Sequence, residues 1–251
     1  MICYSMLQNN VYIDSNTHTY WDYDGNQYVS LSRAREIFKR PFDKSVARHC
    51  AGKGKYVGMS EQQVLQHWDD KRIKASDHGT KIHNAIETYT NTGVLSEDET
   101  LHALLQSIGS DYREYARTYS EEILYSPSYA SKGTRIAGTT DRILQLSARG
   151  NVIDIEDYKT NLEKGIQLFN KDNKYFLSPF EHMQDCNFND YSLQLSVYAF
   201  MAEELFGYKV RSLWIRYIPA DNPLNYRRIP VPYMKSEVIN FLEYYHKEKS
   251  K

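Results

Sequence analysis

The first third of the chain changes from an alternating polarity pattern to a helical one. Residues 11–31 are rich in Tyr and Thr and are interrupted at Asp24-Gly25, a dipeptide typical of a tight β-hairpin turn. From residue 32 to about residue 106 the apolar positions follow helical spacing. Three breaks are expected in this region, at Pro41, at 52–54 and at His78-Gly79. The pattern predicts a hairpin followed by a helical region, with helices at 80–90 and 97–119.

The middle of the chain favours β-structure. Three β-favouring runs at 123–125, 136–146 and 152–159 predict successive strands, with a turn at 148–151 between the last two. Residues 160–189 show no periodicity, and a loop of that length in a compact domain is typical of a functional segment. Because cations and aromatics are mixed in it, the loop is expected to form a lid or channel wall that contacts nucleic acid. These side chains are Lys164, Phe169, Lys171, Lys174, Tyr175 and Phe176. A disordered surface loop is the alternative.

The last quarter of the chain predicts a crossover helix, two strands and a closing helix. Asp190 is a suitable N-cap for a helix that runs to Phe206 and stops at Gly207. Strands are expected at 210–218 and 226–231, and an amphipathic helix at 235–247. This order of elements predicts an α/β fold with a central mixed β-sheet flanked by helices. We expect residues 1–75 to form an N-terminal hairpin-plus-helical accessory region of the same domain, and residues 76–251 its core.

Composition is that of a soluble globular protein, with 251 residues, 41% of them apolar and 25% charged. No run of 18 apolar residues is present and the N-terminus lacks a secretory pattern, so a cytoplasmic protein without a membrane span is expected. The three scattered cysteines favour a reducing compartment and are too few for an all-cysteine iron–sulfur cluster. They are Cys3, Cys50 and Cys186.

Positive and negative charges nearly cancel over the whole chain, but they are distributed unevenly along the sequence. The formal net charge is −1, whereas residues 33–74 hold eleven Lys and Arg against five acids, an excess of six positive charges. A positive surface of this kind can follow a phosphate backbone. The alternative is an ordinary solvated helical surface, and the sequence leaves both open.

Candidate chemistry centres on Asp141 and on Asp157-Tyr158-Lys159. Side chains alternate along a strand, so Asp157 and Lys159 share one face while Glu156 points to the other. Two carboxylates can hold a hard cation such as Mg²⁺, which neutralises a phosphate and lowers the pKa of a bound water. A nearby lysine can orient or deprotonate that water or stabilise developing charge. The alternative is a structural ion pair between Asp157 and Lys159.

Two polar pairs at helical spacing extend this candidate site. His83 and Glu87 are four residues apart and therefore share a helix face, as do Gln194 and Tyr198. Imidazole and carboxylate are both plausible metal ligands. Gln194 and Tyr198 stand on an otherwise apolar helix, which favours a position beside a wet site. A polar helix surface and a boundary stripe next to solvent are the respective alternatives.

Four motifs occur in an order that resembles a known family. They are Gly79-x-x-x-His83, Gly138-Thr-Thr-Asp141, Asp157-Tyr-Lys-Thr160 and Gln194-x-x-x-Tyr198. Together they resemble the RecB-like, phage-type exonuclease branch of the PD-(D/E)XK nuclease superfamily, which includes the mitochondrial genome-maintenance exonuclease and lambda-type exonucleases. The motifs span nearly half of the chain. The resemblance implies a restriction-endonuclease-like core.

The resemblance also implies roles for individual residues. The implied metal ligands are His83, Asp141, Asp157 and the carbonyl oxygen of Tyr158, with Lys159 as the catalytic lysine. Gln194 and Tyr198 would contact DNA, and Glu87 and Glu122 occupy positions where related nucleases often carry acids. Two departures from the family pattern are Thr140 in place of proline and Asp157 in place of glutamate. The cysteine cluster of some relatives is missing, which implies no iron–sulfur cluster.

The implied activity is that of a deoxyribonuclease that depends on one or two Mg²⁺ or Mn²⁺ ions. The resemblance favours an exonuclease over an endonuclease. The enzyme would act on single- or double-stranded DNA in phage or bacterial recombination, replication or repair, in the host cytoplasm if phage-encoded. A single-strand annealing or replication protein is the partner that such a role implies. The alternatives are a junction-resolvase-like endonuclease and a catalytically silent nucleic-acid-binding or assembly protein. RNA as substrate also stays open.

Overall fold

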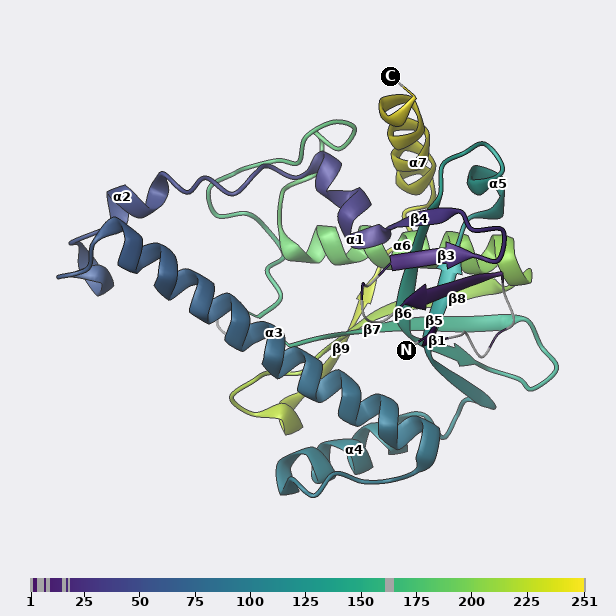
Figure 1. The fold of residues 1–251 in the computed structure, drawn as a ribbon. Helices are drawn as coiled ribbons and strands as arrows, with labels where there is room; N and C mark the ends of the chain where they lie inside the picture. The colour runs from purple at the N-terminus through teal and green to yellow at the C-terminus, as the bar shows by residue number, and fades with distance from the viewer. Residues whose placement is uncertain are drawn as a thin grey trace.

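One mixed sheet runs through the protein, and helices cover both of its faces (Figure 1). The structure is a computed structural model that describes residues 2–3, 7, 10–14, 17, 19–160 and 165–250. Among these residues no helix combines the length and the apolar character that a membrane span requires. The predicted α/β class with a central mixed sheet is confirmed, and the arrangement is consistent with a restriction-endonuclease-like core.

The sheet has nine strands in the described part of the chain, in the order β1-β2-β3-β4-β6-β7-β8-β9, with β5 also paired to β6. Neighbours are antiparallel except β4 with β6 and β7 with β8, which are parallel. The strands are β1 (Ile2–Cys3), β2 (Val11–Asp14), β3 (Thr19–Asp22), β4 (Gln27–Ser30), β5 (Arg117–Tyr125), β6 (Ile136–Gln145), β7 (Val152–Lys159), β8 (Lys209–Tyr217) and β9 (Arg227–Val231). The hairpin predicted at Asp24-Gly25 joins β3 to β4, and Gly25 has the positive φ of 81° that such a turn requires.

Helices pack on both faces of this sheet. The helical segments are α1 (Leu31–Ala34), η1 (Arg35–Phe38), α2 (Val46–Cys50), η2 (Gly54–Tyr56), α3 (Glu61–Thr92), α4 (Glu99–Asp111), α5 (Pro127–Ala130), α6 (Asn187–Phe206), η3 (Pro223–Asn225) and α7 (Lys235–Lys249). The main core joins α6, α7 and η1 to one face of β6, β7 and β8. A second core joins α4 and the C-terminal half of α3 to the other face. Figure 1 shows the N-terminal half of α3 running away from the sheet, with α2 at its far end.

Helix α3 is one uninterrupted helix of 32 residues, so the break predicted at His78-Gly79 is wrong. Ser60 starts the helix with a capping box, and Gly93 ends it with a left-handed φ of 73°. Gly79 serves packing rather than termination, because a Cβ there would lie 3.0 Å from the Thr160 hydroxyl. Helix α3 also spans the expected boundary between the accessory region (residues 1–75) and the core (residues 76–251). The two parts are therefore joined by a continuous helix and not by a linker.

The helix predicted over 97–119 ends earlier, at Asp111. Its start is close to the expectation, because Asp98 caps it by accepting hydrogen bonds from the backbone of Thr100 and Leu101. Residues from Arg117 onward instead join β5, whose first pair is Arg117 with Gln145. Long-range pairing with β6 therefore overrides the local helical periodicity.

Part of the 160–189 segment contributes to the core. Phe176 and Phe180 are buried, and the Leu177 amide donates to the Phe38 carbonyl at 2.7 Å. The expectation of a surface that stacks bases on Phe176 is therefore wrong, because that ring packs edge-on against Phe38. Lys164 lies outside the described residues. Phe169 is exposed, so the predicted lid or channel wall that contacts nucleic acid stays a prediction for the residues around it.

Helix α6 begins at Asn187, three residues before the predicted cap. Cys186 holds the N-cap position, and Asp190 lies in the first turn, where its charge suits the helix dipole. The Asp190 carboxylate forms ion pairs with Arg35 at 2.9 Å and Lys39 at 3.0 Å. The predicted stop at Gly207 is confirmed, with φ of 65°.

Candidate active site

The candidate site lies where β6 and β7 separate. Along the edge of β6 opposite to β5, Ile136 and Ala137 pair with β4. Further along the same edge, the last four residues, Arg142 to Gln145, pair with β7. Among the described residues, the intervening Gly138–Asp141 motif has no strand partner on that edge. Strand β7 continues to Lys159 along β8, beyond its last pair with β6 at Glu156. Asp141 and Asp157 therefore stand at a fork in the sheet, where polar side chains can face a common space.

A distortion in β5 places a further acid at this fork. Glu121 lies opposite Asp141, between the pairs Ser120–Arg142 and Glu122–Thr140, and has a φ of 54°. That left-handed conformation costs about 1–2 kcal/mol for a residue with a side chain. It interrupts the usual alternation, since Tyr119 and Leu124, five residues apart, both pack on the main core. Strain of this kind concentrates at functional sites.

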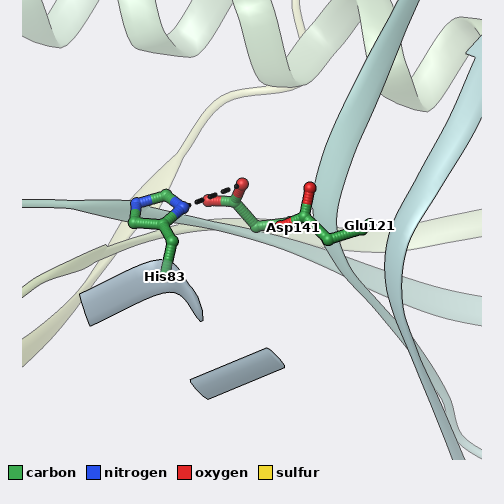
Figure 2. A group of neighbouring side chains, drawn as sticks. All are labelled: His83, Glu121 and Asp141. Atoms are coloured by element: carbon green, nitrogen blue, oxygen red, sulfur yellow. Dashed lines mark ion pairs between the residues drawn. The ribbon is translucent and has the colours of Figure 1, made fainter. Parts of the chain in front are cut away.

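His83, Glu121 and Asp141 form the tightest cluster of potential metal ligands among the described residues, with ligand atoms all within 4.8 Å of one another. Figure 2 shows the His83 ring on α3 directed at the Asp141 carboxylate, with Glu121 beside it. The Nδ1 atom of His83 lies 3.4 Å from Oδ1 of Asp141. Ligands on opposite sides of Mg²⁺ lie about 4.2 Å apart, so an ion needs only a small contraction of this cluster.

The backbone of Tyr158 completes one side of the cluster. Its amide donates to Oδ2 of Asp141 at 2.6 Å, a bond that replaces a strand partner at the fork. The N–H and C=O groups of a residue in an extended strand point to the same side, so the Tyr158 carbonyl also faces β6. This orientation is compatible with the ligand role that the resemblance implies for that oxygen.

Asp157 pairs with Lys159 instead of joining the three-residue cluster. Both side chains project from the same face of β7, and the Lys159 ammonium also lies 4.7 Å from the centre of the Tyr191 ring on α6. Ring and carboxylate together hold the ammonium at the fork. Asp157 is close enough to influence the pKa of both His83 and Glu121, so it belongs to the same electrostatic centre.

The pKa shifts show a concentration of negative charge at the fork. Burial and the Asp141 charge raise the pKa of Glu121 to about 8. Burial favours the neutral His83 ring, but Asp141 outweighs it and raises the pKa of His83 to about 9. Burial also opposes the charge on Lys159, but Asp157 and Asp141 together outweigh it and raise the pKa of Lys159. Crowded acids that draw protons toward them are suited to a divalent cation.

The two motif glycines permit close approaches around the site. A Cβ at Gly138 would lie 2.8 Å from the Tyr198 ring, so only glycine lets Tyr198 pack directly on β6. Gly79 in the same way lets α3 lie against Thr160 at the end of β7. These contacts set the position of His83, one turn along α3 from Gly79, relative to the two strands.

The other predicted site residues lie at different depths. Gln194 and Tyr198 are buried and joined by a 3.3 Å hydrogen bond, and the Tyr198 ring packs against Gly138 beside the fork. Glu87 lies one turn beyond His83 and lines the same cavity. Glu122 is fully buried and accepts a hydrogen bond from the Leu7 amide at 3.1 Å, outside the metal-ligand cluster. The DNA-contact role of Gln194 and Tyr198 stays a prediction.

Glu156 lies on the opposite face of β7, as strand alternation predicts. Its carboxylate is fully buried and forms ion pairs with Arg216 and Arg228, each at 2.7 Å. Asp154 on the same face pairs with Arg211 and accepts a 2.8 Å hydrogen bond from Tyr115. These acids belong to a buried structural network, which leaves Asp157 as the carboxylate of β7 that faces the fork.

An open cavity of about 360 Å³ gives access to the cluster. One side is the face of α3 that carries His83 and Glu87, and the opposite side is formed by Glu121. The remaining lining residues are Ala75, Ser76, Gly79, Thr80 and Asn84. Small side chains along this helix face leave room for a ligand to approach the acids.

Glu121 is the functional candidate that sequence reasoning missed. The predicted helix extended to Tyr119 and the predicted strand began only at Ile123, so Glu121 fell between elements. A strand beginning at Arg117 would have placed Glu121 directly opposite Asp141. The sequence resemblance points instead to its neighbour, Glu122.

We expect Glu121→Gln to weaken Mn²⁺ binding by about tenfold or more, because one charged oxygen ligand is replaced by a neutral one. Calorimetric titration of Mn²⁺ into the protein measures the change. Glu122→Gln is the matched control, since its amide oxygen can still accept the Leu7 hydrogen bond away from the cluster. Equal Mn²⁺ affinity in the Glu121 variant and the wild type would remove Glu121 from the ligand set.

Comparison with known proteins gives distant likenesses among solved structures. No family model matches the chain, and no curated protein matches it. Among solved structures, a "putative exonuclease" from Eubacterium rectale is 15% identical with a TM-score of 0.40, covering 85% of this chain and 80% of its own. The protein SSO0001 is 14% identical with a TM-score of 0.30, covering 58% of this chain and 57% of its own.

Proposed function

We propose that the protein is a metal-dependent nuclease that hydrolyses phosphodiester bonds at the fork between β6 and β7. The observation that carries this proposal is the convergence of His83, Glu121 and Asp141 beside the Asp157–Lys159 pair. An imidazole, several carboxylates and a lysine gathered at one fork of the sheet, beside an open cavity lined by His83, Glu87 and Glu121, have the composition that phosphate hydrolysis requires. The four motifs of the sequence meet at this one place, which supports the same conclusion.

The metal ligands in this proposal are His83, Asp141 and Asp157, with Glu121 added from the geometry. A Mg²⁺ or Mn²⁺ ion held there would neutralise phosphate charge and acidify a bound water. The residues fit such an ion, because burial and the neighbouring Asp141 charge raise the pKa of Glu121 to about 8, and a cation would stabilise its carboxylate. His83 would bind the ion as the neutral ring, with its proton released.

Lys159 is suited to stabilising negative charge on the phosphate. Because Asp157 raises its pKa, the side chain is a cation at neutral pH, which favours charge stabilisation and water positioning over proton removal. The Tyr191 ring and the Asp157 carboxylate restrain the ammonium before substrate arrives. A restrained charge loses less conformational entropy when the transition state forms.

DNA is the proposed substrate, and cleavage from an end is the proposed mode, in recombination, replication or repair. The resemblance of the four motifs to phage-type exonucleases supports both points. Retention of Lys159 and of the acids at the fork speaks against a catalytically silent protein. The candidate site is suited to binding phosphate and metal and not to distinguishing the sugar, so RNA is tested as a substrate alongside DNA.

Activity is expected to require Mg²⁺ or Mn²⁺ and to fail in Ca²⁺ or EDTA. Ca²⁺ binds oxygen ligands with longer bonds and looser geometry, so it should occupy the site without supporting the reaction. End-labelled single- and double-stranded DNA and RNA are digested with each ion and analysed on sequencing gels. Cleavage at an unchanged rate in excess EDTA would contradict the proposed metal dependence.

A further inference from the structure

A second charged surface lies outside the active-site cavity. Residues 39–74, which we term the basic arm, run out from η1 to α2 and return along the N-terminal half of α3 (Figure 1). The arm holds nine Lys and Arg against four acids, an excess of five positive charges. The whole chain has a net charge of −1, so everything outside the arm carries a net charge of about −6. Positive charge is therefore concentrated on this one projection.

The arm is folded around its own small core. Ala47, Tyr56 and Val64 are buried together, and the Trp68 indole donates to the Tyr56 hydroxyl at 2.6 Å. This core fixes α2 and η2 on the end of α3. The exposed cations are thereby carried on a rigid projection, and their substitution should leave the projection folded.

Much of the arm's positive charge has no acidic partner. Arg48 pairs with Glu61 and Arg72 pairs with Asp69. By contrast, four exposed lysines lie beyond ion-pair distance of any acid in the part of the chain that the structure describes; they are Lys44, Lys53, Lys55 and Lys74. Unpaired surface cations are available to phosphate groups at no cost in broken ion pairs.

The arm is continuous with the cavity. Arg72, Ser76, Gly79, His83 and Glu87 follow one another at spacings of three or four, so they lie on one face of α3. The last four line the cavity, and Arg72 extends that face by one turn onto the arm. Arg72 lies about 16 Å along the helix axis from His83, and the start of α3 about 33 Å.

We propose that the basic arm binds the sugar–phosphate backbone of the nucleic acid whose scissile phosphate occupies the fork. This inference rests on the proposed nuclease function and extends it by assigning a second contact. At 3.4 Å per nucleotide step along a duplex strand, the arm corresponds to phosphates about five to ten steps from the cleaved bond. It supplies affinity without base contacts, so it holds nucleic acid irrespective of sequence.

The test compares two triple variants. The arm variant is Lys53→Gln, Lys55→Gln and Arg72→Gln. The matched control removes three exposed cations elsewhere, Arg149→Gln, Lys209→Gln and Lys247→Gln, of which the first two lie at the opposite end of β6, β7 and β8 from the fork. Binding to fluorescent DNA of about 30 base pairs is measured in Ca²⁺ between about 50 and 200 mM salt.

The arm variant is expected to bind DNA on the order of 100-fold more weakly near physiological salt. The plot of log binding constant against log salt concentration should also be shallower by two to three units, because each lost phosphate contact reduces its slope by about 0.9. The control variant should match the wild type. On a substrate shorter than about five nucleotides, the arm variant should cleave like the wild type, because the strand ends before it reaches the arm. If the triple variant does not fold, the double variant Lys53→Gln, Lys55→Gln replaces it in the test. Its log–log salt dependence of DNA binding should be shallower by about two units.

Unchanged DNA affinity and salt slope in a folded arm variant would overturn the proposal and assign the arm, with its exposed Phe42 and Val57, to a protein partner. Equal losses in both triple variants would also overturn it, since that result indicates a nonspecific effect of net charge. Binding in Ca²⁺ does not require cleavage, so a wild type that binds through the arm but never cuts would refute the nuclease function alone.

Discussion

Asp141→Asn is expected to lower the single-turnover rate of DNA cleavage by at least about 10³-fold. Asp141 is the residue on which the site converges: its carboxylate contacts His83 at 3.4 Å and accepts the Tyr158 amide at 2.6 Å. Asparagine keeps the shape and can still accept the amide, but the ligand charge is lost. Rapid-quench measurement with excess enzyme in Mn²⁺ gives the rate of the chemical step.

Asp154→Asn is the matched control for this variant. Asp154 is also a buried aspartate of the central sheet, but its partners are Arg211, Ser212 and Tyr115 on the face away from the fork. Its replacement should lower the melting temperature and leave the rate per folded molecule within about threefold of wild type, because no metal ligand is touched. Similar rate losses in the two variants would show that Asp141 acts through stability rather than chemistry.

Lys159→Ala is expected to slow cleavage by about 10²-fold or more while leaving Mn²⁺ affinity within a few-fold of wild type. The ammonium contacts Asp157 and the Tyr191 ring but is not itself a ligand. Ca²⁺-supported DNA binding should fall only slightly, because one phosphate contact among several is lost. Lys209→Ala, an exposed lysine on the neighbouring strand β8, provides the matched control.

A purely structural role for the Lys159–Asp157 ion pair predicts a different outcome. In that case Lys159→Ala would lower the melting temperature equally with and without metal, and turnover per folded molecule would be retained. The catalytic assignment predicts a loss of stability in EDTA, where Asp157 is left buried without its partner, and recovery when Mn²⁺ replaces the lost charge. Melting curves in EDTA and Mn²⁺, together with the single-turnover rate, separate the two roles.

Strand β7 shows how much a strong local pattern determines. Its predicted limits, 152 and 159, are those observed, because a β-favouring run ends in a turn on one side and at Thr160 on the other. Side-chain alternation separated Asp157 from Glu156 correctly, as the buried Arg216 and Arg228 partners of Glu156 demonstrate. Gly207 ended α6 as expected, because a left-handed C-cap is a local requirement.

Features that depend on contacts between distant segments were not predictable in this way. The sequence predicts a helix break at Gly79, whereas in the structure this glycine leaves room for Thr160 at the end of β7. Glu121 enters the site only because β5 is distorted opposite Asp141, and a left-handed glutamate has no signature in the sequence. The sequence predicts a base-stacking surface at Phe176, whereas its ring packs against Phe38 from the N-terminal region. Each of these depends on a partner more than 15 residues away.

The most direct test of the account is the digestion of end-labelled DNA in Mn²⁺ by wild-type protein and by Asp141→Asn protein, expressed and purified in parallel. Parallel purification matters, because a contaminating nuclease would act equally in both samples. The account predicts that the wild type shortens the labelled strand and that the variant, folded to the same extent, leaves it intact. Equal digestion by both proteins, or no digestion of any DNA or RNA by the wild type, would contradict the assignment of the fork between β6 and β7 as a nuclease site.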